Sequence, residues 1–166
     1  VYFLAFVPVW GFAAATKTYI SQYVGAKRIE DIRTIQWRIQ LLSMVFMLIT
    51  FHGSFLYPEA IISWINPEEA FIEKSADTLR YVSLSMFIFA YFSVFFQTIN
   101  GIGKTQITFL IEAIAVGLYA LSAYVFIKVW QLDIVYVWTV EYVYFGAMGL
   151  MSIAYLKLVN WKQKLY

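Results

Sequence analysis

Five long apolar stretches constrain this chain more than any other feature of its sequence. They cover residues 2–24, 37–56, 80–99, 107–127 and 134–156. Each is about as long as the roughly 20 residues that a helix needs to cross the hydrocarbon core of a bilayer. Hydrophobic residues make up 62% of the chain and charged residues 13%, whereas about a quarter of the residues in a soluble domain are charged. We therefore expect an all-α, polytopic transmembrane helical bundle with five spans.

The segments between these stretches are polar or rich in turn-forming residues. Residues 25–33 form a short charged loop that begins with a glycine, a residue that commonly ends helices. Residues 57–78 contain two prolines and five acids, and we expect an external loop with one short helix lying at the membrane interface. Brief turns are expected at 100–105 and 131–133, and the chain ends in a basic tail, 157–166.

Positive charges gather on one side of the predicted spans. With spans of alternating direction, eight Lys and Arg residues fall on one side and three on the other. The eight are Lys27, Arg28, Arg33, Arg38, Lys104, Lys157, Lys162 and Lys164, and the three are Lys74, Arg80 and Lys128. Because cytoplasmic loops carry the excess of positive charge, we expect a multi-pass protein of the cell (inner or plasma) membrane with a cytoplasmic C-terminus. Five spans would then place the N-terminal end outside, and we expect a further helix upstream of Val1.

Several classes of site are disfavoured by composition. Cysteine is absent and histidine occurs once, as His52, which argues against disulfides, thiol catalysis and Cys/His metal sites. We predict no metal ligands and no cofactor apart from a coupling ion. The net charge of +2 comes without the dense cationic cluster that a phosphate backbone requires, so we expect no nucleic-acid partner. The lipid bilayer is the expected surrounding.

One face of the first span is small and polar. At 100° per residue, Gly11, Ala14, Thr18, Gln22 and Gly25 fall within about 80° of one another. Small residues allow membrane helices to pack closely, and a polar face of this kind is equally typical of a helix that lines a substrate cavity. Both interpretations stay open.

Lys17 is the ionisable residue inside this span. It lies eight positions before Gly25, and therefore about 12 Å from that helix end. Helical side chains tilt toward the N-terminus, which aims Lys17 at the middle of the membrane. We predict that it faces a wet cavity or a partner, with a long side chain reaching the interface as the alternative. Gly11, Lys17, Thr18 and Gln22 are thus candidates for lining a substrate cavity.

Two acids, Glu112 and Glu141, lie inside spans. A carboxylate within a membrane can carry a proton or bind a cation, so both are candidates for ion coupling. Each also lies near the start of its span, where it could reach interfacial water, and the two interpretations remain open.

Three amide side chains, Gln97, Asn100 and Gln106, flank the glycine-containing turn at 100–105. We expect them to satisfy backbone groups at the helix ends. Gln97 is also a candidate for lining the substrate cavity.

Three motifs occur in an order that resembles a known family of transporters. Residues 11–15 (GFAAA) lead to 19–27 (YISQYVGAK), Gln97 precedes 100–105 (NGIGKT), and Trp138, Glu141, Tyr144 and Gly149 precede 155–157 (YLK) and Trp161-Lys162. The first motif resembles the second helix of each lobe of MATE (multidrug and toxic compound extrusion) transporters. The second is similar to the turn between the fourth and fifth helices of a lobe, and the third to the last helix and tail of the C-terminal lobe.

The resemblance covers essentially the whole chain and implies a function. Residues 1–166 would be part of the C-terminal lobe, with the spans as helices eight to twelve of twelve and the N-terminal lobe of the same chain as their partner. Such a protein is a secondary active transporter in which H⁺ or Na⁺ influx drives export of drugs or cationic organic metabolites. The span 80–99 lacks the acid that the sodium-coupled branch places in its tenth helix, so the coupling ion is left open.

Three other functions remain as alternatives. A lipid-linked oligosaccharide flippase of the same superfamily is the nearest. An intramembrane enzyme is motivated by Lys17, Gln22 and Glu112, but no span holds a carboxylate pair. A passive assembly subunit would use the small-residue face of the first span. We expect a transporter and not an enzyme.

Overall fold

The computed structural model describes residues 2–161, and the regular structure within this range is helical. The helices are α1 (Tyr2–Gly25), α2 (Ile32–Leu56), α3 (Pro58–Ser63), α4 (Glu69–Gly101), α5 (Thr105–Tyr124), α6 (Ile134–Val137) and α7 (Thr139–Leu158), with a 3-10 turn η1 (Ile29–Asp31) and a π-helical segment η2 (Val125–Val129). The expected all-α class is confirmed.

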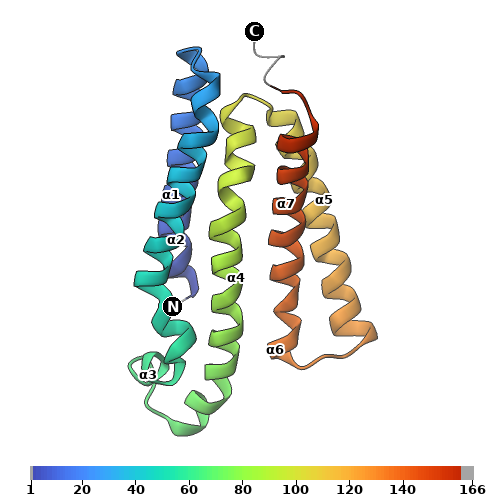
Figure 1. Ribbon diagram of the computed structural model, residues 1–166. Coiled ribbons are helices and arrows are strands. Elements are labelled where there is room, and N and C mark those ends of the chain that lie inside the picture. Colours follow the sequence, from blue (N-terminus) through green and yellow to red (C-terminus); the bar gives the residue numbers. More distant parts are fainter. Residues whose placement is uncertain (1, 162–166) are drawn as a thin grey trace.

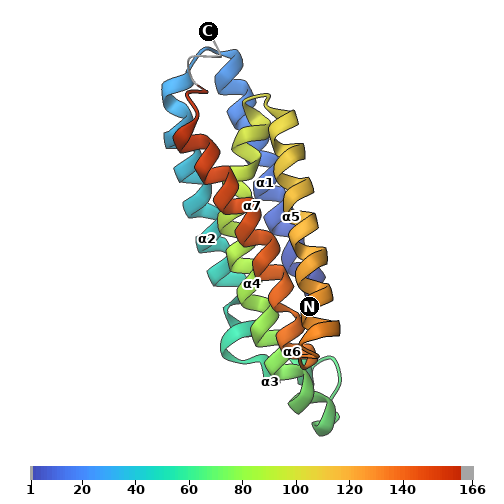
Figure 2. The same cartoon turned by 90° about the vertical axis from the view of Figure 1, so that its right-hand side faces the viewer.

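The five long helices, α1, α2, α4, α5 and α7, lie side by side and alternate in direction (Figures 1 and 2). Helix α4 is the centre of the arrangement, because α1 and α2 pack against one side of it and α7 against another. Helix α5 packs mainly against α7 and so lies at the periphery. Half of the most apolar part of α4 is buried, against 11% for α5.

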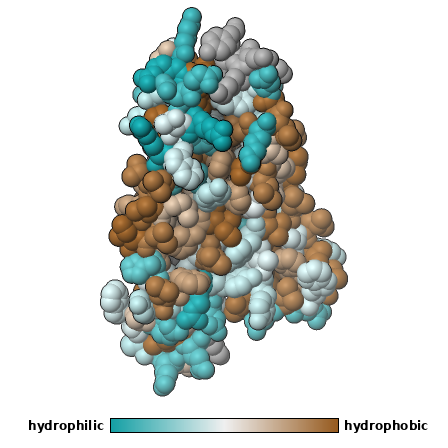
Figure 3. Space-filling model, viewed as in Figure 1, coloured by the Kyte–Doolittle hydropathy of each residue, from teal (hydrophilic) through white to brown (hydrophobic). Residues whose placement is uncertain are grey.

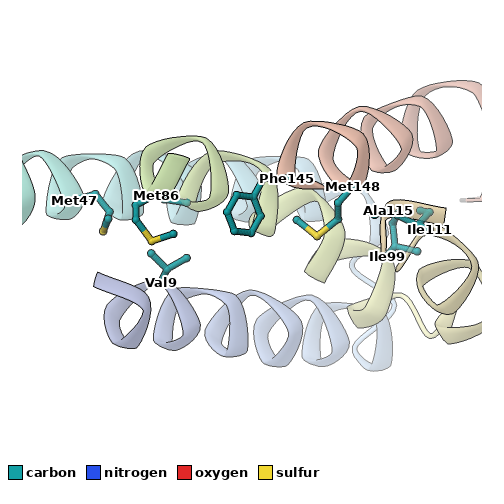
Figure 4. Packing of buried hydrophobic residues seen from close by; sticks show 9 residues of the cluster. Val9, Met47, Met86, Ile99, Ile111, Ala115, Phe145 and Met148 are labelled. Carbon is teal, nitrogen blue, oxygen red and sulfur yellow. The ribbon is translucent and has the colours of Figure 1, made fainter. Parts of the chain in front are cut away.

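The main core cluster gathers around the second half of the central helix α4. Its buried members come from all five long helices and are Val9, Met47, Met86, Ala90, Ile99, Ile111, Ala115, Phe145 and Met148 (Figure 4). Close packing replaces water exclusion as the force that joins helices in a membrane, so the fit of these side chains decides how the helices sit.

Two glycines allow neighbouring helices to approach α4 closely. A Cβ atom at Gly149 of α7 would lie 1.9 Å from Cγ of Phe92, and one at Gly101 would lie 2.6 Å from Cβ of Ile20 in α1. No side chain fits at either place without movement of the neighbouring helix. The interfaces of α4 with α1 and α7 therefore depend on these two residues.

Four segments of the described chain are long and apolar enough to cross a membrane. They are Ile29–Leu56, Glu69–Gly101, Thr105–Val129 and Ile134–Leu158, and they correspond to the second to fifth predicted spans. The first predicted span forms the 24-residue helix α1 but is not among the four, consistent with the polar residues in its second half. Its membrane crossing stays a prediction.

The expected loop at 57–78 is wrong in extent. It contains the predicted short helix, α3, but α4 already begins at Glu69. The side-chain oxygen of Asn66 accepts a hydrogen bond from the backbone N–H of Glu68 at 3.0 Å, which orders the chain just before this helix start. The first turns of α4 carry exposed acids, which keep this part of the helix in a polar environment. The helix is therefore longer than the apolar stretch from which it was predicted.

Arg80 connects three helices at the end of the bundle where α4 begins. Its guanidinium lies 3.3 Å from Oε1 of Glu59 and 3.2 Å from Oδ1 of Asp77, and it donates to the carbonyl oxygen of Phe55 at 3.2 Å. These contacts link α2, α3 and α4 at one end of the bundle.

Hydrophilic residues collect at the two ends of the molecule, with a broad hydrophobic band between them (Figure 3). The end with the α4–α5 turn carries the cation-rich group, of which Lys162 and Lys164 lie outside the described residues. The predicted turns are confirmed, because α1 ends at Gly25 and Gly103 adopts φ +79°, a conformation that favours glycine.

Candidate functional site

A cavity of about 480 Å³ lies among α1, α4, α5 and α7. Its lining is Trp10, Ala13, Phe89, Ser93, Phe96, Gln97, Asn100, Thr105, Thr108, Phe109, Glu112, Tyr144 and Met148. The volume lies within the range of small-molecule sites, about 300–1,000 Å³. Asn100 and Thr105 place one part of the cavity at the α4–α5 turn, and Trp10 and Met148 extend it toward the middle of the bundle. We call it the acidic cavity, because Glu112 is the one charged residue among the described residues of its lining.

Glu112 is held by a hydrogen bond across two helices. The hydroxyl of Tyr144 on α7 donates to Oε1 of Glu112 on α5. The ring of Tyr144 is in turn fixed by an edge contact with Tyr119 at 6.0 Å and by Phe145 at 5.1 Å between centroids. A carboxylate inside a membrane is costly without such a donor. The pair therefore places a single acidic group against the cavity in a defined position.

A second polar group continues the lining toward the α4–α5 turn. Nδ2 of Asn100 donates to Oε1 of Gln97 at 3.1 Å. Oγ1 of Thr108 lies 2.8 Å from Oδ1 of Asn100 and 2.9 Å from the carbonyl oxygen of Thr105, and its one proton can serve only one of them at a time. Thr108 and Glu112 are four residues apart on α5 and so share a face. The acidic cavity is thus polar from the turn as far as Glu112.

The geometry brings two of the predicted site residues together. Gln97 and Glu112 both line the acidic cavity. Gln97 and Asn100 differ from expectation, because they bond to each other and to Thr108 and not to backbone at the helix ends. Gln97 and Asn100 are three residues apart on α4 and so share a face, and the close α4–α5 turn brings Thr108 of α5 within hydrogen-bond distance of Asn100.

Glu141 lies outside the lining. It precedes Tyr144 by three residues on α7 and is near enough to Tyr119 and Tyr144 to act on both electrostatically. Both candidates, Glu112 and Glu141, are therefore neighbours of Tyr144, but of the two only Glu112 borders the cavity.

The small polar face of α1 lies apart from the acidic cavity. Gly11, Ala14, Thr18, Gln22 and Gly25 are all exposed, and Lys17 is exposed beside them. The opposite face is buried through Val9, Ala13, Thr16 and Ile20. Oγ1 of Thr18 donates to the carbonyl oxygen of Ala14 at 3.0 Å, within the same helix. The face that the helical wheel predicts therefore exists as one surface, and its role in lining a substrate cavity stays a prediction.

Sequence reasoning missed most of the polar lining. Neither Thr108 nor Ser93 was predicted from the sequence to be a site residue, and Tyr144 was named only as part of a motif. The spacing of four between Thr108 and Glu112 was available as a sign that both face one cavity. Glu112 and Tyr144 are 32 positions apart in the sequence, and nothing in the sequence indicated their contact.

Comparison with known proteins identifies relatives. The model of the MatE family matches residues 1–125. The "Probable multidrug resistance protein NorM" of Thermotoga maritima is 26% identical over 136 residues, which are 81% of this chain and 29% of that protein. The chain thus spans less than a third of the length of this relative. No solved structure matches.

Proposed function

The chain belongs to the MatE family, and from that premise we propose that it is part of a secondary active transporter that exports drugs or cationic organic metabolites in exchange for H⁺ or Na⁺. The observation that carries the proposal is the acidic cavity, in which one carboxylate borders a space of about 480 Å³ beside aromatic rings. We assign the chain to helices eight to twelve of the transporter, within its C-terminal lobe. The N-terminal lobe is the proposed partner.

The lining of the acidic cavity suits a flat organic cation. Trp10, Phe89, Phe96 and Phe109 supply aromatic surfaces, and cations are attracted to the faces of such rings. Glu112 supplies the opposite charge, and a coupling ion that neutralises this carboxylate would release the organic cation. If the coupling ion and the organic cation compete for the carboxylate of Glu112, a single site can exchange one for the other.

Tyr144 positions the carboxylate for this exchange. Its hydroxyl proton is donated to one oxygen of Glu112, which leaves the second oxygen for a ligand in the cavity. The amide of Gln97 and the hydroxyl of Thr108 supply further polar contacts in the same lining.

We propose that the end of the bundle with the α4–α5 turn is cytoplasmic, which also places the C-terminus there. This is supported by the excess of Lys and Arg at that end and by the exposed acids at the other. Substrate would then reach the acidic cavity from the cytosol past Asn100 and Thr105.

The test uses the full-length gene in a host that lacks its own efflux pumps. Expression should lower ethidium accumulation, and Glu112→Gln should abolish this effect, because the amide keeps the shape but carries no charge. The matched control is Glu73→Gln, an exposed acid at the other end of α4, which should export like the wild type. Dissipating the H⁺ or the Na⁺ gradient separately identifies the coupling ion.

Two results would contradict the proposal. Export by Glu112→Gln at wild-type rate and equal membrane abundance would show that the acidic cavity is not the exchange site. An unchanged ethidium level together with movement of a lipid-linked oligosaccharide in vesicles would favour the flippase.

A further inference from the structure

A second cavity, also of about 480 Å³, lies at the cation-rich end between α2, α4 and α7. Its charged lining residues are Arg33 near the start of α2 and Lys157 near the end of α7. The walls include Phe95, Ile153, Leu156 and Trp161. We call this space the basic pocket. It is separate from the acidic cavity, with which it shares no lining residue.

The positive charge of the basic pocket is uncompensated within residues 2–161. Neither Arg33 nor Lys157 takes part in an ion pair with a described carboxylate, and no acid is found in the lining. Asp31, close in sequence to Arg33, is paired with Arg28 at 2.7 Å. Two cations on different helices therefore border one hollow.

Three polar atoms along the face of α2 that meets α4 have no hydrogen-bond partner within the described structure, Nε2 of Gln36, Oε1 of Gln40 and Oγ of Ser43, and of these residues only Gln36 lines the pocket. Nε2 of Gln36 is buried and makes no hydrogen bond within the described structure. Gln36 and Gln40 are four residues apart on α2, and Gln40 donates to the carbonyl oxygen of Tyr91 on α4 at 2.7 Å, so this stripe of α2 faces α4. A buried donor of this kind costs free energy unless something accepts from it. Because neighbouring atoms cover Nε2 of Gln36, it meets an anionic oxygen in the pocket only after the side chain turns toward the pocket.

The apolar wall of the pocket begins at a tryptophan and continues along α4 and α7. Trp161 is 8% exposed, and its Nε1 donates to the carbonyl oxygen of Leu156 at 3.1 Å, which fixes the indole as part of the wall. Tryptophan is favoured at the level of the head groups. Phe95 and Ile153 lie deeper along α4 and α7, where α2 and α7 flank α4 (Figure 1). A ligand with a charged end and an apolar tail fits this sequence of surfaces.

We propose that the basic pocket binds the phosphate head group of an anionic membrane phospholipid. Arg33 and Lys157 contact the phosphate oxygens, the side chain of Gln36 turns into the pocket to donate to one of them, and an acyl chain lies along Phe95 and Ile153. Basic pockets between membrane helices on the cytoplasmic side are suited to such head groups. Free phosphate has the same charged oxygens as the head group but no apolar part that could contact the apolar wall.

The experiment measures lipid retained by the full-length protein. The protein is purified in detergent with a mixture of phosphatidylglycerol and phosphatidylcholine, and native mass spectrometry counts each bound lipid. The wild type should prefer phosphatidylglycerol, and the double variant R33Q/K157Q should lose at least about tenfold of this preference, since each cation near a membrane surface contributes several-fold. The single variant Q36L should lose less, with its folding checked by thermal denaturation.

The matched control is R38Q/K104Q, which removes one Arg and one Lys at the same end of the molecule but outside the pocket lining. It should keep the preference for phosphatidylglycerol. An equal loss in this control would overturn the proposal in favour of general surface charge. Displacement of phosphatidylglycerol by millimolar inorganic phosphate would overturn it in favour of a soluble anion, and equal retention of both lipids by the wild type would overturn it outright.

Discussion

The acidic cavity and the basic pocket have the same volume and are built on the same two helices, α4 and α7, yet their charges are opposite. The acidic cavity has Glu112 and no cation in its described lining, and the basic pocket has Arg33 and Lys157 and no acid. The difference comes from the helices that complete each site and from the end of α7, which contributes Lys157 to the basic pocket. Helix α5 contributes a carboxylate to one, and the start of α2 contributes a guanidinium to the other. A common framework thus presents two unlike sites.

The largest expected effect is a reversal of charge in the acidic cavity. Glu112→Lys replaces the carboxylate with an ammonium group, which repels a cationic substrate. The ammonium group also cannot accept the hydrogen bond that the hydroxyl of Tyr144 donates to Glu112. Export of ethidium should fall to the level of cells without the protein, while retention of phosphatidylglycerol stays at the wild-type level. Loss of both readouts would show that the two sites are not independent.

The next largest effect concerns the helix interface that both sites share. Gly149→Ala puts a methyl group where Phe92 lies, at 1.9 Å from its Cγ, and overpacking of this kind costs about 1–3 kcal/mol. Thermal denaturation in detergent should occur at lower temperature, and both export and lipid retention should decline. The control is Gly146→Ala on the same helix, where an added Cβ meets no atom within 4 Å. If the two variants melt alike, the close approach of α4 and α7 is not needed.

A smaller effect should follow from the removal of one hydroxyl group. Tyr144→Phe keeps the ring contacts but deletes the donor to Glu112. A hydrogen bond to a charged group contributes about 1.5–3 kcal/mol, so we expect the apparent affinity for substrate to drop by about tenfold or more, with lipid retention unchanged. Tyr124→Phe, at an exposed position near the end of α5, serves as the control. Equal transport by Tyr144→Phe and wild type would remove the tyrosine from the site.

The smallest expected effect is on the exposed face of α1. Lys17→Ala should weaken export by about two- to fivefold if this face lines the substrate path, because an ionisable group in a span is costly to keep without a function. Ethidium efflux rates at equal expression provide the measurement, with Lys128→Ala, an exposed lysine at the other end of the molecule, as the comparison. A rate unchanged by Lys17→Ala would leave that face with packing as its role.

The parts of the fold that depend on neighbouring residues were predictable. Apolar stretches of about 20 residues predicted the helices, Gly25 and Gly103 predicted two of the turns, and the helical wheel predicted the exposed face of α1. The start of α4 at Glu69 was not predictable from hydropathy, because a helix can continue beyond the membrane on exposed acids. Part of the candidate site was predictable: Gln97 and Glu112 were chosen from sequence, Tyr144 was named only as part of a motif, and Thr108 was not chosen.

The sequence by itself determined the class of the protein, its helices and the uneven distribution of its charges, because each of these depends on composition or on spacing along one helix. Only the tertiary structure decided which side chains meet. The contact of Tyr144 with Glu112 and the meeting of Arg33 with Lys157 at one pocket require particular helices to be neighbours. Which helices are neighbours depends on packing around α4, where Gly149 and Gly101 allow the close approach of α7 and α1. Packing of this kind leaves no periodic pattern in the sequence.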